Sequence, residues 1–422
     1  MKILRASELT SDFFAYKEPM AMANVRSIIE EVRRRGDASL REYTRNFDGV
    51  EVLQLAVSAE EIGSSKRKSD ATLIAAITSA AASIREFATK QFRQLADFEL
   101  ETAPGVIAGQ RVVPLGRVGI YVPGGRYPLI STLLMCAIPA QVAGVKEIAV
   151  CSPPSKTGGM HRSILIAADI LGLRELYKVG GAQAIAAMAY GTESIRNVDK
   201  IVGPGNRYVA AAKREVFGAV GIDMMAGPTE VMIIADADAD PELVASDMLA
   251  QAEHDPDAMP LLVTTSAALG RDAAKAVLRQ VEGLSTAETA SKSLDANGTI
   301  IIVKSLNDAV ELANRRAPEH LELHVKRPDA LVKGLRNFGT LFIGAGAVEA
   351  LGDYSSGLNH TLPTNTTARY CAGLSVRDFL KLQTTLKVGP KGLKAIGPTA
   401  VTLARAEGLE AHARSVEKRM KK

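Results

Sequence analysis

Residues 118–125 read VGIYVPGG, an apolar β-strand pattern that ends in a proline and two glycines. The pattern recurs along the chain: the apolar segments 147–151, 176–179 and 200–202 each end in a turn rich in glycine or proline. Stretches with helical spacing follow these turns. Strands that alternate with helices in this way are typical of a parallel sheet covered by helices. Such sheets bind ligands at the loops after their strands, so we expect a ligand crevice beside these turns.

A second unit of the same kind follows residue 229. Four further apolar segments are strand candidates, at residues 230–235, 260–265, 298–303 and 339–343. Between them, residues 241–253 and 307–316 have helical spacing. The sequence therefore predicts an α/β protein with two Rossmann-like parallel-sheet domains of an incomplete dinucleotide-binding type. The predicted divisions are an N-terminal arm (1–20), a first Rossmann-like domain (21–117 with 230–370), a second one (118–229) and a C-terminal helical tail (371–422).

Composition narrows the class of protein. The chain has 422 residues, of which 47% are hydrophobic and 23% charged, and its net charge is only +4. We therefore expect more than one core, and no binding to nucleic acid or to an acidic membrane surface. No apolar run approaches the roughly 20 residues that a membrane helix needs, and no secretory signal is evident. Three scattered cysteines without a C-x-x-C pattern fit free thiols in a reducing compartment, so the expected location is the cytoplasm.

Metal-binding residues are concentrated in a few short segments that lie far apart in the chain. Four of the six histidines belong to these segments. Gln251 and His254 are three residues apart, so they share one face at the end of a predicted helix. Asp353 follows a glycine, and His360 and His412 lie in polar surroundings. Nitrogen and oxygen ligands of this kind suit a borderline metal such as zinc. Each residue also has an ordinary alternative, an exposed side chain at a helix end or in a turn.

The adjacent pair Glu319-His320 is more distinctive. Neighbouring residues cannot share a helix face, so the pair after Pro318 is expected in an extended or turn segment. There a carboxyl and an imidazole can reach one substrate from different sides, and both can be tuned for proton transfer near neutral pH. The alternative is a charged pair at the start of a surface strand. His324, four residues on, is expected to be structural.

The glycine turns are weaker signals. Backbone amides at the start of a helix favour anions such as a pyrophosphate, and the turns at Gly124, Gly180 and Gly203 each precede such a helix. However, the sequence contains neither G-x-G-x-x-G nor G-x-x-x-x-G-K-[ST]. Nucleotide binding is therefore only weakly supported by the motifs.

Taken together, seven blocks in this order resemble the histidinol dehydrogenase family, from about residue 20 to His412. The resemblance implies a four-electron oxidation of an amino alcohol, through an aldehyde, to an acid, with two NAD molecules and one water. In that reaction His320 would take the alcohol proton, and Glu319 would activate the water that attacks the aldehyde. The blocks are 118–125, 179–187, 203–206, 226–230, 251–254, 317–322 and 359–364.

The resemblance also implies the binding residues. One zinc ion per subunit would be bound by Gln251, His254, Asp353 and His412. These four residues, with His320, would also contact the substrate, as would Thr229, His360 and Glu407. NAD would be contacted by Tyr121, Gln183 and Asn206. The C-terminal segment would reach into the partner's site, which predicts a homodimer whose active sites are shared.

Two departures leave the substrate open. Thr229 stands where the family often has serine, and Arg126-Tyr127-Pro128 follows the double glycine where small residues are common. An arginine suits a sulfonate or a carboxylate, although pairing with a cofactor phosphate or a surface acid is the simpler role. The alternatives are therefore a related NAD-linked dehydrogenase of another small alcohol, such as a sulfonated diol, or a metal-binding α/β protein without catalysis.

Overall fold

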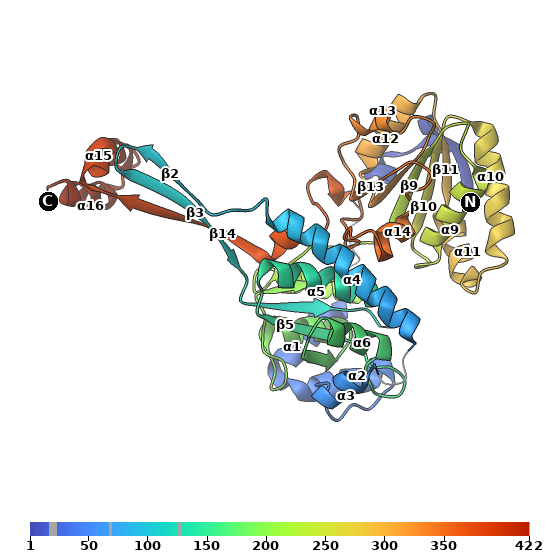
Figure 1. The fold of residues 1–422 in the computed structure, drawn as a ribbon, viewed down its shortest axis with the longest axis horizontal. Helices are drawn as coiled ribbons and strands as arrows, with labels where there is room; N and C mark the ends of the chain where they lie inside the picture. The colour runs from blue at the N-terminus through green and yellow to red at the C-terminus, as the bar shows by residue number, and fades with distance from the viewer. Residues whose placement is uncertain (17–22, 67–69, 125–127, 422) are drawn as a thin grey trace.

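The computed structural model describes residues 1–16, 23–66, 70–124 and 128–421. It has two sheet domains, and a thin arm projects away from both of them (Figure 1). Both domains are of the α/β type with parallel strands, as the alternation of apolar segments and helical spacing predicts. Helix starts also agree with their capping signals, for example at α3 (Ala59–Ser64), where the Ser58 side chain accepts the backbone N–H of Glu61.

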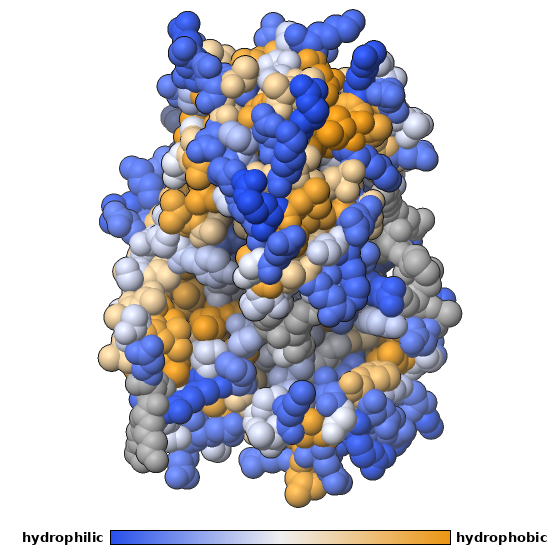
Figure 2. Space-filling view, turned by 90° about the vertical axis from the view of Figure 1, so that its right-hand side faces the viewer, coloured by the Kyte–Doolittle hydropathy of each residue, from blue (hydrophilic) through white to orange (hydrophobic). Residues whose placement is uncertain are grey.

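The larger sheet contains six parallel strands in the order β1-β11-β10-β9-β12-β13. Every residue of β9 and β12 is buried, which fits central strands covered on both faces. Figure 2 shows the molecule from the right-hand side of Figure 1, where hydrophilic side chains surround several hydrophobic patches. The strands are β1 (Lys2–Arg5), β9 (Glu230–Ala235), β10 (Met259–Thr264), β11 (Thr299–Ile302), β12 (His320–His324) and β13 (Thr340–Ile343).

Helices cover both faces of this sheet. Three of them share a core on one face, and two pack on the other. A further short helix, α14 (Glu349–Tyr354), follows β13 and lies beside the start of β12. The helices of the first face are α9 (Pro241–Ala252), α10 (Ala267–Val281) and α11 (Ala287–Ala296), and those of the second are α12 (Leu306–Arg316) and α13 (Asp329–Val332).

The second sheet has five parallel strands in the order β6-β5-β4-β7-β8. Its strands are β4 (Arg117–Tyr121), β5 (Glu147–Ser152), β6 (Glu175–Lys178), β7 (Lys200–Val202) and β8 (Gly221–Ile222). One face is covered by α4 (Ala71–Phe92), α5 (Ile130–Ala143) and α6 (Arg162–Ile170). The other is covered by α1 (Ala23–Arg35), α2 (Asp37–Asp48), α7 (Gly181–Tyr190) and α8 (Arg207–Val216).

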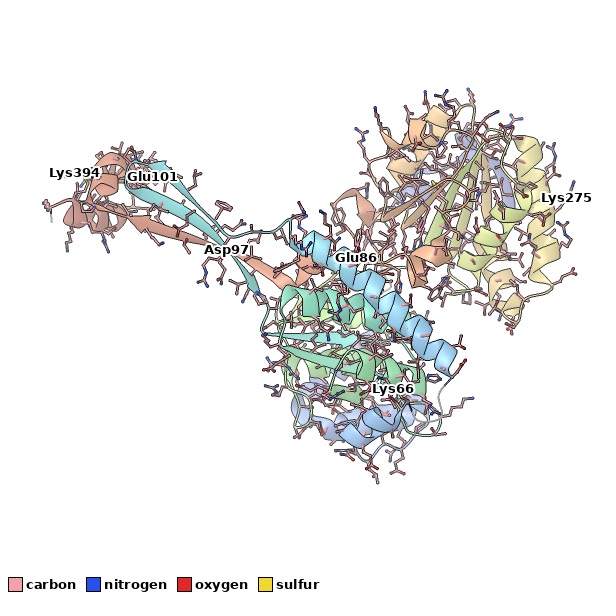
Figure 3. All side chains as sticks on the ribbon, in the orientation of Figure 1. Lys66, Glu86, Asp97, Glu101, Lys275 and Lys394 are labelled. Atoms are coloured by element: carbon pink, nitrogen blue, oxygen red, sulfur yellow. The ribbon has the colours of Figure 1, made fainter. Side chains whose placement is uncertain are left out.

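The arm is an antiparallel sheet capped by two helices. Its strands are β2 (Phe98–Ala103), β3 (Val106–Pro114) and β14 (Leu380–Val388), in the order β14-β3-β2, followed by α15 (Pro390–Ala406) and α16 (Glu410–Met420). Side chains stand out from both faces along its length, from near Asp97 to Glu101 and Lys394 at its far end (Figure 3).

One face of the arm sheet is apolar and exposed. Leu386 lies opposite Ala108, and Ala108 lies opposite Leu100, so the two leucines share a face. Their side chains are 65% and 58% exposed. We call this surface the apolar arm face; it consists of Phe98, Leu100, Leu382, Leu386 and Val388.

The N-terminal residues are distributed differently from the predicted divisions. Residues 2–5 were expected in an irregular arm, but they pair with β11 as the edge strand β1. Residues 21–117 were expected with 230–370, but α1 packs on α7 and α8, and α4 packs on α5 of the five-stranded domain. Residues 98–114 form part of the arm. The apolar stripe of a helix shows that it needs a sheet to cover, but not which of two sheets it will cover.

One helix among the described residues, α4, is long and apolar enough by length and composition to cross a membrane, and 22% of its most apolar window is buried. The sequence analysis expected no such run. A single helix of this kind is weak evidence for a membrane span. Ile77 and Ile84 of α4 are buried in the core of the five-stranded domain.

Candidate active site

The predicted acid–base pair lies at the start of a central strand. Glu319 precedes β12 and His320 is its first residue, directly beside Thr229 and Glu230 at the start of β9. Ligands were expected at the loops that follow the parallel strands. In the six-stranded sheet, however, the acid–base residues lie at the N-terminal ends of the strands. Helix α9 runs back to this edge and brings Gln251 to it, where the amide Nε2 donates to Thr229 Oγ1 at 2.9 Å.

Glu319 is a buried carboxyl with two donors on one oxygen. The hydroxyl of Thr229 donates to Glu319 Oε2 at 2.6 Å, and the backbone N–H of Glu230 donates to the same oxygen at 3.0 Å. Its exposed fraction is 6%. Burial raises the pKa of Glu319 well above its usual value, although both hydrogen bonds act in the opposite direction. A carboxyl with a raised pKa in a fixed position is suited to general-base catalysis near neutral pH.

His320 has one anchored ring nitrogen and one free ring nitrogen. Nδ1 lies 3.2 Å from the backbone oxygen of Glu230, which as an acceptor places the ring proton on Nδ1. Nε2 is buried without a hydrogen-bond partner and lies 4.0 Å from Asp353 Oδ1. Burial lowers the pKa of His320 to about 3. The imidazole is therefore neutral, and its basic nitrogen Nε2 faces the predicted metal ligands.

Two of the four predicted metal ligands meet beside His320, together with a third group. Ligand atoms of His254, Glu349 and Asp353 lie within 4.8 Å of one another. The sequence analysis did not single out Glu349. Its signal was present: Glu349 and Asp353 are four residues apart, so they share one face of α14. Burial raises the pKa of Asp353 to about 7.

The residues present fit a divalent metal. Gln251 is fully buried, yet its Oε1 has no hydrogen-bond partner, and the same holds for Glu349 Oε2. Buried acceptors without donors are costly unless another group binds them. The imidazole of His254 at the end of α9 is 40% exposed and faces Glu349 Oε1 at 3.9 Å. The donor set of amide oxygen, imidazole and carboxylate is within the range of ligands that zinc accepts.

His360 lies where the two domains meet. The neighbouring Asn359 side chain donates to the backbone oxygen of Met135 in α5 at 2.7 Å. His360 Nε2 is buried without a hydrogen-bond partner, and burial lowers the pKa of this imidazole to about 4. A neutral imidazole with a free nitrogen at this junction can accept a hydrogen bond from a ligand held between the domains.

The predicted NAD-contacting residues lie at the C-terminal ends of the strands of the five-stranded sheet. Tyr121 ends β4 and accepts the backbone N–H of Gly181 at 3.0 Å. Gln183 is buried in the first turn of α7, and its Oε1 has no partner. Asn206 caps α8 through its side chain. Between them Gly203 has φ +111°, and a Cβ there would clash with the backbone oxygen of Tyr121, so only glycine fits.

Glu407 and His412 do not join the other site residues within the chain. Glu407 ends α15 and His412 lies in the first turn of α16, both exposed at the far end of the arm. Figure 1 shows this end well away from β9 and α14. Arg126 and Tyr127, on which the alternative substrate depends, lie outside the described residues.

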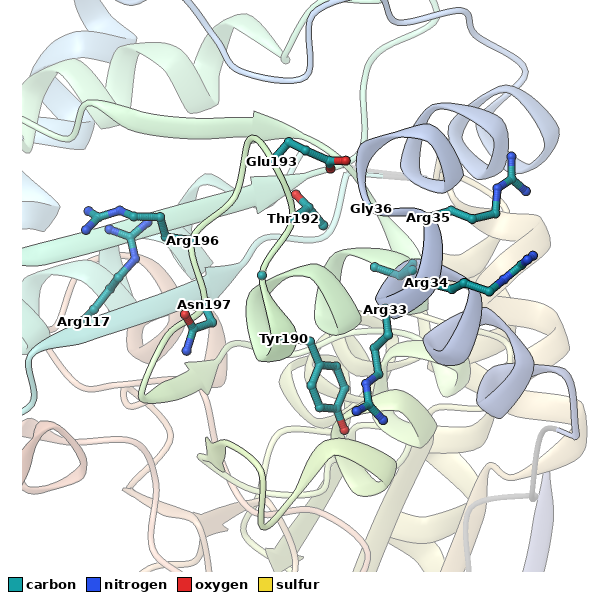
Figure 4. Close-up of a pocket in the computed structure, with 12 residues that line it drawn as sticks. Arg33, Arg34, Arg35, Gly36, Arg117, Tyr190, Thr192, Glu193, Arg196 and Asn197 are labelled. Carbon is teal, nitrogen blue, oxygen red and sulfur yellow. The ribbon is translucent and has the colours of Figure 1, made fainter.

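A cavity of about 610 Å³ lies elsewhere, between the end of α1 and the loop after α7 (Figure 4). Arg117, one of several arginines that line it, begins β4, so the cavity lies at the edge opposite to the glycine turns. These arginines already have partners. Arg117 and Arg196 pair with Glu147, and the Arg33 guanidinium stacks over Tyr190. The cavity therefore offers no separate set of catalytic groups.

Comparison with known proteins points to one family. The family model described as histidinol dehydrogenase matches residues 15–420. The chain is 50% identical over 400 residues to the histidinol dehydrogenase of Agrobacterium fabrum, covering 94% of this chain and 92% of that one. It is 49% identical over 398 residues to that of Geobacillus kaustophilus, with coverage of 94% and 93%.

A solved structure agrees with the sequence comparison. The crystal structure of histidinol dehydrogenase from Elizabethkingia anophelis matches with a TM-score of 0.94 and 38% identity. The match covers 99% of this chain and 97% of that one. The likeness therefore extends over both domains and the arm.

Proposed function

The chain belongs to the histidinol dehydrogenase family and is an oxidoreductase of the CH–OH group, and from this premise we propose its reaction in detail. L-Histidinol is oxidised through L-histidinal to L-histidine, the last step of histidine biosynthesis, with two NAD molecules and one zinc ion per subunit. The observation that carries this proposal is the pair Glu319-His320, buried beside the metal-ligand group of His254 and Asp353. We expect the enzyme in the cytoplasm.

Gln251, His254 and Asp353 would hold the zinc ion, with His412 of a second subunit as the fourth ligand. When bound there, the zinc ion would supply a Lewis acid that anchors the substrate, and NAD would supply the hydride acceptor. The orphaned Gln251 Oε1 and the raised pKa of Asp353 support this assignment. Thr229 and His360 would contribute substrate contacts, and Tyr121, Gln183 and Asn206 contacts to NAD.

His320 would act in the first oxidation. Its Nδ1 is held by the Glu230 carbonyl, so Nε2 is the atom that can take the proton of the alcohol. A neutral imidazole is required for this, and burial keeps it neutral. The proton must leave before the second oxidation, and the lowered pKa of His320 favours its release.

Glu319 would act in the second oxidation, as the base that takes a proton from the attacking water. The hydroxyl of Thr229 and the Glu230 N–H hold one oxygen, Oε2. The other oxygen, Oε1, is left for the water. Because two protons are removed at different atoms in the two steps, two bases in one site suit a reaction with two oxidations.

A homodimer with shared sites is proposed from the arm. Its apolar face has leucines that are more than half exposed, and a strip of such residues on a thin sheet is stable only when covered. A second copy of the chain would cover it through a two-fold interface. The same association would bring Glu407 and His412 of one subunit to the site of the other.

The test is the stoichiometry of the reaction. With zinc and limiting histidinol, the purified enzyme should form two NADH for each histidinol consumed. One NADH would leave the aldehyde as the product and exclude the four-electron reaction. No turnover of histidinol, with turnover of a sulfonated diol, would exclude histidinol as the substrate and identify the alternative dehydrogenase.

A further inference from the structure

Behind the active site lies a second group of polar residues that the reaction does not use. We call Asp247, Glu322 and His324 the inner triad. Their exposed fractions are 7%, 0% and 3%, so all three side chains are buried in the domain core. His324 Nε2 lies 3.2 Å from Asp247 Oδ2 and 3.6 Å from Glu322 Oε2. Burying three ionisable groups carries a desolvation cost, which their interactions with one another must offset.

The inner triad lies on the same helix and strand as the active-site residues Gln251 and His320, further into the domain core. On α9, Asp247 lies one turn before Gln251, so both face β12. On β12, Glu322 and His324 follow His320 at intervals of two residues, on one face of the strand. The triad therefore joins the helix and the strand that carry the site residues at their ends.

Glu322 connects the triad to the third element of the site. Its Oε1 accepts the backbone N–H of Glu349 at 2.9 Å. Glu349 is the first residue of α14, and a carboxylate is favoured at a helix N-terminus because the first amides lack partners within the helix. One turn later the same helix presents Asp353 to the active site. A shift of Glu322 would therefore move Asp353.

His324 supplies the charge that lets two carboxylates remain in the core. Burial alone would lower the pKa of His324, but its interactions with Asp247 and Glu322 outweigh burial and raise it to about 9. The imidazolium thus lies between an acid on α9 and an acid on β12. Glu349 on α14 also lies close to Glu322, and it is held there through its backbone N–H.

We propose that the inner triad is a positioning group that fixes α9 and α14 against β12 and so sets the spacing of the metal ligands. The inference rests on the proposed function, because it assumes that His254 and Asp353 bind the metal. It adds that their spacing depends on residues that touch neither metal nor substrate. Partners of this kind, one contact behind the ligands, change metal affinity by about 10–100-fold when removed.

The experiment compares Glu322→Gln and His324→Gln with the wild-type dimer. Zinc affinity is measured by chelator competition, and the Co²⁺-substituted proteins are compared by their visible spectra. Weaker zinc binding by about 10-fold or more, with altered Co²⁺ bands, is expected for both variants. Turnover at saturating zinc should show a raised KM for histidinol with a smaller change in kcat, because the chemistry at His320 is untouched.

Asp37→Asn is the matched control. Asp37 is a buried carboxylate of the other domain, 6% exposed, that accepts hydrogen bonds from Ser194. It should lose thermal stability without losing zinc affinity. If the triad variants lost stability but kept wild-type zinc affinity and Co²⁺ spectra, the inner triad would be merely structural and the inference wrong.

Two other outcomes separate the inference from its premise. Loss of a second bound metal equivalent in the variants would show that the triad is itself a metal site, which would overturn the positioning role. Absence of zinc binding in the wild-type dimer would overturn the proposed function as well. Wild-type binding with unchanged variants would overturn only the inference.

Discussion

The acid–base centre and the tip of the arm carry site residues in opposite environments. Glu319 and His320 are buried at the start of a central strand, where burial sets their protonation. Glu407 and His412 are exposed at the tip of the arm, away from both domains. The difference shows that the fold buries the two predicted bases together, whereas it places Glu407 and His412 far from them. Under the proposed function, one chain would therefore contain both bases but would need a second chain to complete its ligands.

The largest effect is expected when the buried centre is altered in one chain and the tip of the arm in the other. His320→Asn and His412→Asn should each lose activity by at least about 100-fold, since one lacks the base and the other a metal ligand. Mixed under conditions that exchange subunits, the two variants should recover about a quarter of wild-type activity. Half of the dimers would be mixed, and each would have one intact site.

The readout is NADH formation after mixing, with each variant alone as the control. Lack of recovery, despite heterodimers detected by differently tagged chains, would place both residues in the site of one chain. The arm would then have no role in completing the neighbouring site.

The second test separates the two bases within the buried centre. Glu319→Gln should slow oxidation of histidinal by about 10²–10⁴-fold, because the amide cannot accept a proton from water. Oxidation of histidinol to the aldehyde should fall much less, since His320 Nε2 is retained. The halves are measured separately with alcohol and aldehyde substrates. Equal slowing of both would contradict the assigned roles.

The third test addresses the arm alone. Leu382→Glu with Leu386→Glu should raise the dimer dissociation constant by more than about 100-fold, since burial of each leucine contributes about 1.5–3 kcal/mol. Activity should then fall on dilution. The control places two glutamates on the opposite face of the strand, as Lys381→Glu with Gln383→Glu, which adds at least as much negative charge. Sedimentation that showed equal weakening in both pairs would argue against the apolar arm face as the interface.

The smallest effect concerns stability against pH. The folded pKa of His324, about 9, lies above the unfolded value of about 6.5. Its contribution is therefore fully present below pH 6.5 and lost as pH rises through 9. His324→Gln should cost about 2–3 kcal/mol at pH 6 and less at pH 9. Chemical denaturation at both values measures this, and a cost that did not change with pH would show that His324 is not charged in the fold.

The sequence by itself determined the local elements and the chemistry. Apolar runs ending in turns rich in glycine or proline predicted the strands β4, β5 and β7, because period and turn residues act over a few neighbours. The pair Glu319-His320 stood out as two adjacent groups able to transfer protons, but its predicted role came from the family resemblance. Glu349 was not predicted, because its spacing of four residues from Asp353 is a weak signal among 47 acidic residues.

Only the tertiary structure decided which elements meet. The apolar face of α1 would have suited either sheet. It packs on α7, which lies about 150 residues further along the chain. The site lies where β9 and β12 begin, because α9 and α14 bring Gln251 and Asp353 to that edge. The pKa values of Glu319 and His320 follow from burial, which no short segment specifies. The distances between these side chains and their burial arise only when the chain is packed, and both are needed to form a site.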